Sequence, residues 1–320
     1  MISQKTQILL LYNYQKTGIQ VRCDSIELFL RHIQELLPAR AIDPPIESNI
    51  ELDKRIANLQ IAALSHIMML IEDLGALSYS FLKKNIDFYS YLDGSGDDEL
   101  GKIIGDFYDS VLKLKNDDIL KILGYVNPNQ HRFPTTDDKN MVISLINDNI
   151  VLTKRVLANA KIFRESHIKI FRRYKHAGYP ILLAPGFSKT DEDLKEKYDF
   201  ISYALTSKSD LDKELAAAPF SAKVIESYRN LLADLSSLLY SITESHIRIK
   251  HKKIDGVIPF VSDCFSKRYS SEIQSRLKLL WDDIENNSLI KEDIVDVHLD
   301  AEASYGVWNH NIDFYSKKIL

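Results

Sequence analysis

The sequence contains little cysteine and no strong excess of one charge. Its two cysteines, Cys23 and Cys264, lie far apart and have no metal-ligand spacing, which indicates reduced intracellular thiols. The 41 Lys and Arg residues stand against 45 Asp and Glu residues, giving a net charge of −4. This balance is too mild to imply a polyanionic partner for the whole molecule, so nucleic-acid binding would have to come from a local patch.

Long apolar runs and familiar catalytic signatures are also missing. The longest apolar run, 61–82, is interrupted by His66, Glu72 and Asp73, so it is a poor membrane span. The N-terminal apolar run is short and no small-residue cleavage site follows it, which argues against a signal peptide. No glycine-rich phosphate loop, nucleophile elbow or dinucleotide fingerprint occurs. We therefore expect a cytoplasmic protein with no membrane partner.

The periodicity of the apolar residues predicts a mainly α fold. Hydrophobic residues make up 45% of the chain and charged residues 27%, as in an ordinary soluble globular protein. Apolar residues recur at helical spacing over three long stretches, which are 50–85, 137–178 and 219–253. Short connections favour an antiparallel arrangement of these helices.

An N-terminal segment precedes the predicted bundle, and a small β insert interrupts it. Residues 1–49 are expected to hold two short helices, 2–16 and 24–37, and a linker with Pro44 and Pro45. We predict a helical bundle over 50–320, and 1–49 either forms one continuous domain with it or stands apart. Short β-favouring runs predict a small β element in the C-terminal half, at about 179–206 and 257–262.

The helix predicted at 137–178 carries the most distinctive chemistry. Asp137 and Asp138 suit its start, and Gly178 suits its end. Its last turns are strongly basic, with Arg164, Lys169, Arg172, Arg173, Lys175 and His176. The simplest explanation is that cations near a helix C-terminus complement its partial negative charge.

The end of this helix, FRRYKHAG at 171–178, resembles the region around the active helix of HEPN-domain proteins. Many of these α-helical proteins are metal-independent ribonucleases or nucleotide-binding partners of toxins, and use an arginine and a histidine on one helix. The resemblance implies that His176 acts as general acid or base and that Arg172 stabilises charge on the phosphate. The chain departs from the family because only three residues separate Arg172 from His176, fewer than in the family motif.

Basic residues also occur in the last turns of the third long helix. If the ends of the second and third long helices are neighbours, five cations would form one anion-binding patch, whose contacts would weaken steeply with salt. These residues are Arg173, Lys175, Arg248, Lys250 and Lys252. The alternative is two separate solvated helix ends.

A repeated motif suggests a metal site. ESHIKI at 165–170 returns as ESHIRI at 244–249, and SHI also occurs at 65–67; duplication, a shared packing role and chance all stay open. The motif places His66, His167 and His246 on the apolar sides of long helices, where three imidazoles would suit zinc or iron. No Glu-x-x-His or His-Glu-x-x-His spacing is present, so the usual bundle metal signatures fail. A core histidine hydrogen-bonded to a neighbour is the simpler alternative.

Three functional interpretations therefore remain, and whether the chain is an enzyme stays open. The leading one is a helical binding or interaction protein without a cofactor, which uses a basic patch at two helix ends to bind RNA or a protein partner. The second is a HEPN-like ribonuclease that uses Arg172 and His176, in each chain or across a homodimer. The third is a bundle that holds zinc or iron through its histidines.

Overall fold

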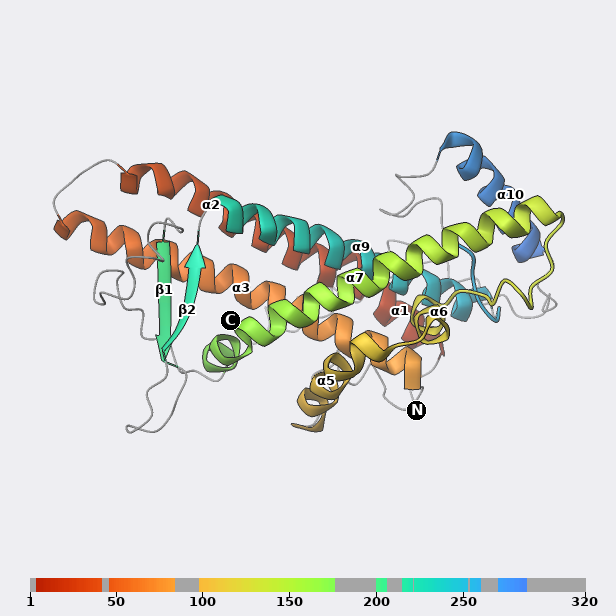
Figure 1. The fold of residues 1–320 in the computed structure, drawn as a ribbon, viewed down its shortest axis with the longest axis horizontal. Coiled ribbons are helices and arrows are strands. Elements are labelled where there is room, and N and C mark those ends of the chain that lie inside the picture. Colours follow the sequence, from red (N-terminus) through yellow and green to blue (C-terminus); the bar gives the residue numbers. More distant parts are fainter. Residues whose placement is uncertain are drawn as a thin grey trace, which may run out of the picture.

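A computed structural model of the chain confirms that it is mainly α (Figure 1). The long helices pack against one another along their lengths, α2 on α3, α3 on α7 and α7 on α9. The residues that the structure describes are 4–41, 46–83, 98–175, 200–205, 215–220, 222–252, 254–259 and 270–286.

The three predicted long helices are present. They are α3 (Ile46–Lys83), α7 (Thr136–Lys175) and α9 (Ala222–Lys252), with ends a few residues from those expected. The remaining helices are α1 (Gln4–Asn13), the π-helical η1 (Tyr14–Ile19), α2 (Gln20–Ala41), α5 (Asp98–Ser110), the 3₁₀ turn η2 (Val111–Lys113), α6 (Asn116–Leu123) and α10 (Ser271–Asn286).

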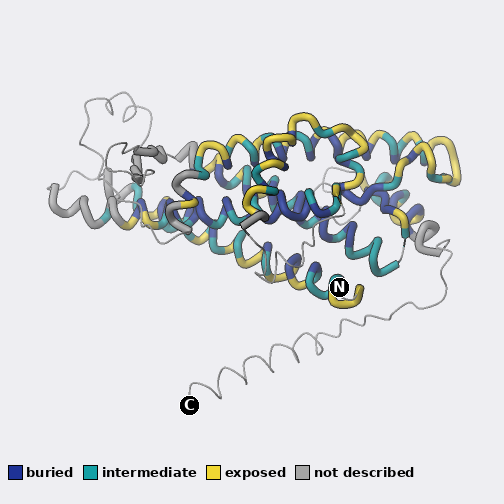
Figure 2. Tube along the Cα trace, turned by 90° about the horizontal axis from the view of Figure 1, so that it is seen from below, coloured by how far each residue is buried: buried dark blue, intermediate teal, exposed yellow. Residues whose placement is uncertain are grey.

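The N-terminal segment is one helical run that belongs to the common core. Where a break between two short helices was expected, the backbone continues from α1 through η1 into α2, with α-helical torsion angles at Asn13 and Gln20. Leu11, Ile26 and Ile33 are buried in the same hydrophobic cluster as the apolar residues of α3, α7 and α9. Figure 2 shows the buried residues on the inward sides of the helices and the exposed ones facing outward.

α7 and α9 are antiparallel. Arg155 of α7 pairs with Asp234 of α9 at 3.7 Å. Further along α7, Phe163 packs edge-to-face on Tyr228, which lies earlier in α9, with 5.4 Å between ring centroids. Since the contacts advance along α7 while they move back along α9, the C-terminal end of α7 lies beside the start of α9.

Capping and an ion pair fix the start of α7. The Thr135 hydroxyl accepts a hydrogen bond from the backbone N–H of Asp138 at 3.1 Å and donates to the Asp138 carboxylate at 2.7 Å. The same carboxylate, 4% exposed, accepts hydrogen bonds from the Nε atom and one Nη atom of Arg276 in α10. The predicted helix start is thus a hydrogen-bonded cap, and it also anchors α10.

Two strands lie between α7 and α9. β1 (Phe200–Leu205) pairs antiparallel with β2 (Leu215–Phe220), with Phe200 opposite Phe220 and Leu205 opposite Leu215. Of the residues predicted to form a β element, 179–199, 206 and 260–262 lie outside the described residues, and Val257 makes only an isolated bridge to Tyr125. The predicted element as a whole stays a prediction.

One described helix is long and apolar enough to cross a membrane, the Arg55–Lys83 portion of α3. In this structure 78% of its most apolar window is buried inside the bundle. Core helices of globular proteins have the same properties, so this helix says little about where the protein resides.

Candidate functional site

The two basic helix ends lie at opposite ends of the bundle, so the condition for a single patch, that the two ends are neighbours, is not met. From the Phe163–Tyr228 contact, Arg172 lies nine residues further along α7. Arg248 lies twenty residues further along α9, in the opposite direction. At 1.5 Å per residue the two positions are about 40 Å apart along the bundle. Arg173 and Lys175 therefore do not join Arg248, Lys250 and Lys252 in one anion-binding surface.

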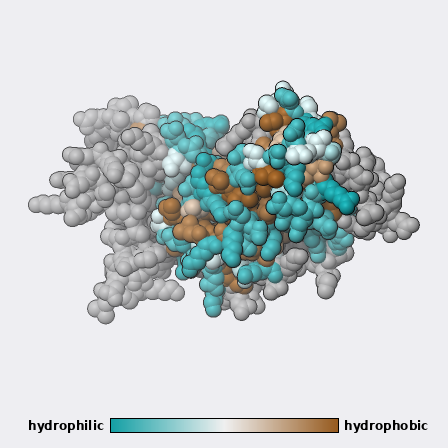
Figure 3. Space-filling view, turned by 45° about the vertical axis from the view of Figure 1, so that its right-hand side comes forward, coloured by the Kyte–Doolittle hydropathy of each residue, from teal (hydrophilic) through white to brown (hydrophobic). Residues whose placement is uncertain are grey.

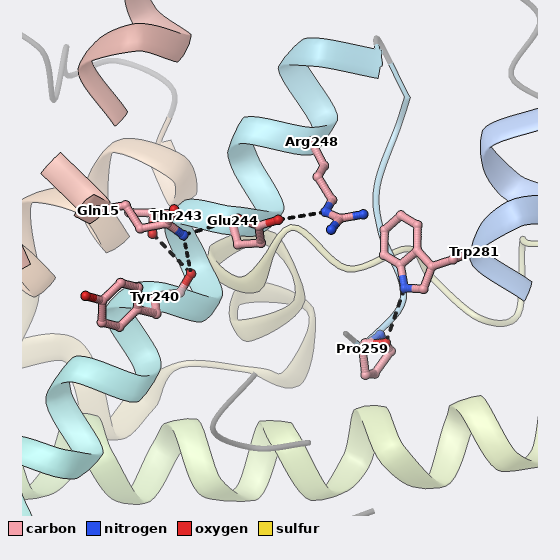
Figure 4. A network of polar contacts seen from close by, with 7 residues as sticks. All are labelled: Gln15, Tyr240, Thr243, Glu244, Arg248, Pro259 and Trp281. Carbon is pink, nitrogen blue, oxygen red and sulfur yellow. Dashed lines mark hydrogen bonds and ion pairs between the residues drawn. The ribbon is translucent and has the colours of Figure 1, made fainter. Parts of the chain in front are cut away.

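The cations near the end of α9 contribute to contacts within the protein (Figure 4). Arg248 forms an i,i+4 ion pair with Glu244 at 2.8 Å, and its guanidinium lies 5.1 Å from the centre of the Trp281 ring. Gln15 donates to the other side of Glu244 at 3.2 Å, and Trp281 donates to the carbonyl of Pro259 at 3.4 Å. This network links η1, α9 and α10.

Lys250 is held in a similar way. Its ammonium group donates to Gln7 of α1 at 2.8 Å, and Gln4 donates to its backbone carbonyl. Because these cations already form ion pairs and hydrogen bonds within the protein, we assign Arg248 and Lys250 a structural role.

At the end of α7, Arg172 is exposed and has no hydrogen bond or ion pair with any residue that the structure describes. The side chains of Arg173 and Lys175 are not described, although their backbone is helical. His176 lies outside the described residues. The proposed pairing of Arg172 with His176 stays a prediction.

The three Ser-His-Ile histidines do not form one group. His66 meets the edge of Phe29. The Nδ1 atom of His167 lies 2.8 Å from the carbonyl oxygen of Phe163 in its own helix. His246 stacks on the Phe81 ring, and its Nε2 atom lies 3.0 Å from the carbonyl oxygen of Ile122.

Within the described part of the chain, no group of three or more His, Cys, Asp or Glu side chains is placed to hold a metal ion. The metal hypothesis therefore gains no support. Burial lowers the pKa of all three histidines, and that of His246 to about 3. His246 is a buried histidine bonded to a backbone carbonyl, as the simpler alternative predicted, and the half-buried His167 makes a bond of the same kind. His66 packs on Phe29, but its buried Nδ1 atom has no hydrogen-bond partner among the described residues.

A buried ionic cluster lies where sequence patterns gave little sign of it. The Tyr14 hydroxyl donates to the Asp73 carboxylate at 2.8 Å, and Arg22 forms an ion pair with the same oxygen. Asp73 is only 1% exposed. The π-helical turn η1 presents Tyr14 to α3, and a side chain at Gly18 would meet the Tyr14 ring at 2.8 Å. The cluster ties the N-terminal run to the core.

Arg164 is another functional candidate that the sequence patterns did not single out. It is 8% exposed, on the side of α7 that faces α5, with its guanidinium 5.6 Å from the centre of the Tyr108 ring. The sequence showed it only as one of several cations near a helix end. A signal was nevertheless present, since Ala160 and Phe171, one turn before and two turns after Arg164, are apolar positions that turn out to be buried.

Exposed apolar side chains are spread over several elements. The large ones among the described residues are Val21, Leu28, Leu112, Val151, Ile162 and Leu279, on α2, η2, α7 and α10. The face in Figure 3 shows hydrophobic residues in separate areas among hydrophilic ones. These scattered positions do not identify a docking surface.

No protein-family model matches this chain, and neither the curated proteins nor the solved structures include a significant match. The site must therefore be interpreted from its own geometry and charge.

Proposed function

We propose that the chain is a non-enzymatic helical binding protein that contacts single-stranded RNA through the last turns of α7. The observation that carries this proposal is the contrast between the two basic helix ends. Arg248 and Lys250 are engaged within the protein, whereas Arg172 is exposed and unpaired among the described residues.

Charge along the chain supports the same end of α7. Four cations, Lys169, Arg172, Arg173 and Lys175, occur within seven residues. Cations that neutralise phosphates release condensed counterions, so binding of this kind is salt-dependent and needs no sequence preference. The contact would be local, consistent with a net charge of only −4.

The test is a mobility-shift titration with a fluorescent single-stranded RNA at several salt concentrations. We expect affinity to fall as salt rises. Arg172→Met should weaken binding and reduce the slope of log K against log[salt] by about 0.7, the value for one phosphate contact on a single strand. Arg155→Met is the matched control, because Arg155 is also an exposed arginine of α7, paired loosely with Asp234. Equal binding by both variants, or no shift for the wild type, would reject the proposal.

The second candidate is a HEPN-like metal-independent ribonuclease. Arg172 is exposed on a long helix of an α-helical bundle, and this position supports the ribonuclease hypothesis. RNA integrity is measured in the same samples, with and without a chelator. Chelator-resistant cleavage that is lost in both Arg172→Ala and His176→Ala would replace the binding proposal with this one.

We also propose a cytoplasmic location, a homodimer as the assembly state, and a small β element at about 179–206 and 257–262. Light scattering coupled to size-exclusion chromatography tests the dimer, and backbone chemical shifts from isotope-labelled protein test the β element.

A further inference from the structure

Arg164 is a buried cation without a counter-charge. Its side chain is 8% exposed, and its Nε atom is fully buried with no hydrogen-bond partner. No hydrogen bond or ion pair joins it to any other residue in the described part of the chain. Its one described partner is the Tyr108 ring. A guanidinium removed from water is costly unless it is paired and hydrogen-bonded, and a cation–π contact offsets only part of that cost.

The nearby acidic side chains are engaged elsewhere. Lys161, one turn earlier on α7, pairs with Glu165 at 2.8 Å and with Asp109 of α5 at 3.8 Å. Glu72 of α3 lies near enough to raise the pKa of Tyr108, but it does not pair with Arg164. The Tyr108 hydroxyl donates to the carbonyl of Ile71 at 2.6 Å, so this tyrosine offers Arg164 its ring and not its oxygen.

Besides Tyr108, the side of α5 that faces the guanidinium carries two glycines. A Cβ atom at Gly105 would lie 3.7 Å from an Nη atom of Arg164, and one at Gly101 would meet nothing within 4 Å. α5 and α7 run antiparallel here, since Asp109 lies near Lys161 and Gly105 near Arg164. Gly101 therefore lies one turn further towards the basic end of α7, and it is exposed. A small group can approach Arg164 from solvent on this side, where neither glycine carries a side chain to block it.

We propose that Arg164 binds the phosphoryl group of a small ligand between α5 and α7, with the Tyr108 ring and the Gly101 and Gly105 backbone lining the site. A guanidinium presents paired N–H donors that match two oxygens of a phosphate or a carboxylate. The phosphoryl group fits better because it carries about −1.5 to −2 charges at pH 7. The C-terminal half of α7 has a large excess of cations to oppose that charge, with Glu165 as its one carboxylate.

This site is separate from the proposed RNA contact. Arg172 is exposed and follows Arg164 by eight residues, about 12 Å along the helix. A negative RNA titration therefore leaves the Arg164 proposal standing, and loss of the Arg164 site leaves RNA binding by Arg172 in place.

The test measures the melting temperature of the full chain at constant ionic strength, with chloride replaced in turn by inorganic phosphate and acetate. Phosphate at one hundred times its dissociation constant should raise Tm by about 5 °C. Arg164→Met should remove this rise, as should Gly101→Leu, which places an apolar side chain on this side of α5 and leaves the charge of Arg164 unchanged. Arg155→Met, an exposed arginine on the same helix, should keep it.

The stability of Arg164→Met without phosphate provides a second, independent result. If Arg164 lacks an internal partner, its replacement by an apolar side chain of similar length should leave Tm unchanged or raise it. A marked fall in Tm would reveal an internal carboxylate partner and overturn the proposal. Equal stabilisation by acetate and phosphate would overturn the phosphoryl assignment, and a phosphate effect that persists in Arg164→Met would overturn the site.

Discussion

Acidification should destabilise the bundle through His246, which lies in the core between α3, α6 and α9. Its ring stacks on Phe81 and its Nε2 atom bonds to the carbonyl of Ile122. Burial is the largest cause that lowers its pKa from 6.5 to about 3. Between these two pH values the unfolded chain binds a proton at His246 that the folded chain does not.

The sign and size of the effect follow from this difference. The stability contribution is fully present above about pH 6.5 and is lost as the pH falls towards 3, because the unfolded state binds more protons in that window. Each pH unit costs about 1.4 kcal/mol. Since pH 5 lies well above the folded-state pKa, the loss between pH 7 and pH 5 is about 2 kcal/mol.

The assay is urea unfolding at pH 7 and pH 5 for the wild type and His246→Gln. Glutamine keeps an N–H donor for the Ile122 carbonyl but does not titrate. The wild type should lose about 2 kcal/mol more than the variant between the two pH values. His66 and His167, whose pKa values are also lowered, are present in both proteins, so their contributions cancel.

Asp138 does not contribute to the loss of stability expected between pH 7 and pH 5. The pairing of Asp138 with Arg276 lowers the pKa of Asp138, so its stabilising effect is present above its ordinary pKa of about 4 and is lost only at lower pH. An identical loss of stability in the wild type and His246→Gln between pH 7 and pH 5 would refute the assignment of a buried neutral imidazole.

Substitutions at four positions test the packing, each measured as the free energy of unfolding in urea at pH 7. Tyr14→Phe should cost about 2 kcal/mol, because the Asp73 carboxylate loses a hydrogen bond in the core; no change would mean that the bond adds nothing. Thr135→Ala should cost about 1 kcal/mol by removing the α7 cap, and Thr135→Ser should restore most of it. Gly75→Ala should destabilise despite the better helix propensity of alanine, since its Cβ would lie 2.8 Å from the Tyr108 ring, with overpacking costing about 1–3 kcal/mol. Gly101→Ala, where a Cβ meets nothing within 4 Å, should instead gain up to about 1 kcal/mol, and equal effects at the two glycines would contradict the packing.

The long helices were predictable because their signals are local. Apolar spacing gave the bodies of α3, α7 and α9, and Asp138 with its neighbours gave the start of α7. The N-terminal run was mispredicted as two helices because its continuity depends on distant contacts. The π-helical turn at Tyr14–Ile19 is accompanied by bonds from Tyr14 to Asp73 and from Gln15 to Glu244, and local propensity does not encode such partners.

The repeated ESHI motif shows the same limit at the level of single side chains. Glu244 pairs with Arg248, four residues after it, whereas Glu165 pairs with Lys161, four residues before it. His167 bonds within its own helix, and His246 reaches a carbonyl of α6. The two copies therefore resemble each other in sequence while the neighbouring elements decide what each side chain contacts.

Two arginines near the C-terminal end of α7, Arg164 and Arg172, differ in burial. Arg164 and Arg172 differ by eight residues, which turns them about 80° apart around a helix, and this rotation buries one and exposes the other. Both suit the negative end of the helix dipole, so that explanation alone does not distinguish them. What distinguishes them is desolvation: an exposed guanidinium is already hydrogen-bonded to water, whereas a buried unpaired one lacks the partner that an anion would supply. Of these two arginines, Arg164 is therefore the one for which we expect a bound anion to make the larger difference to stability.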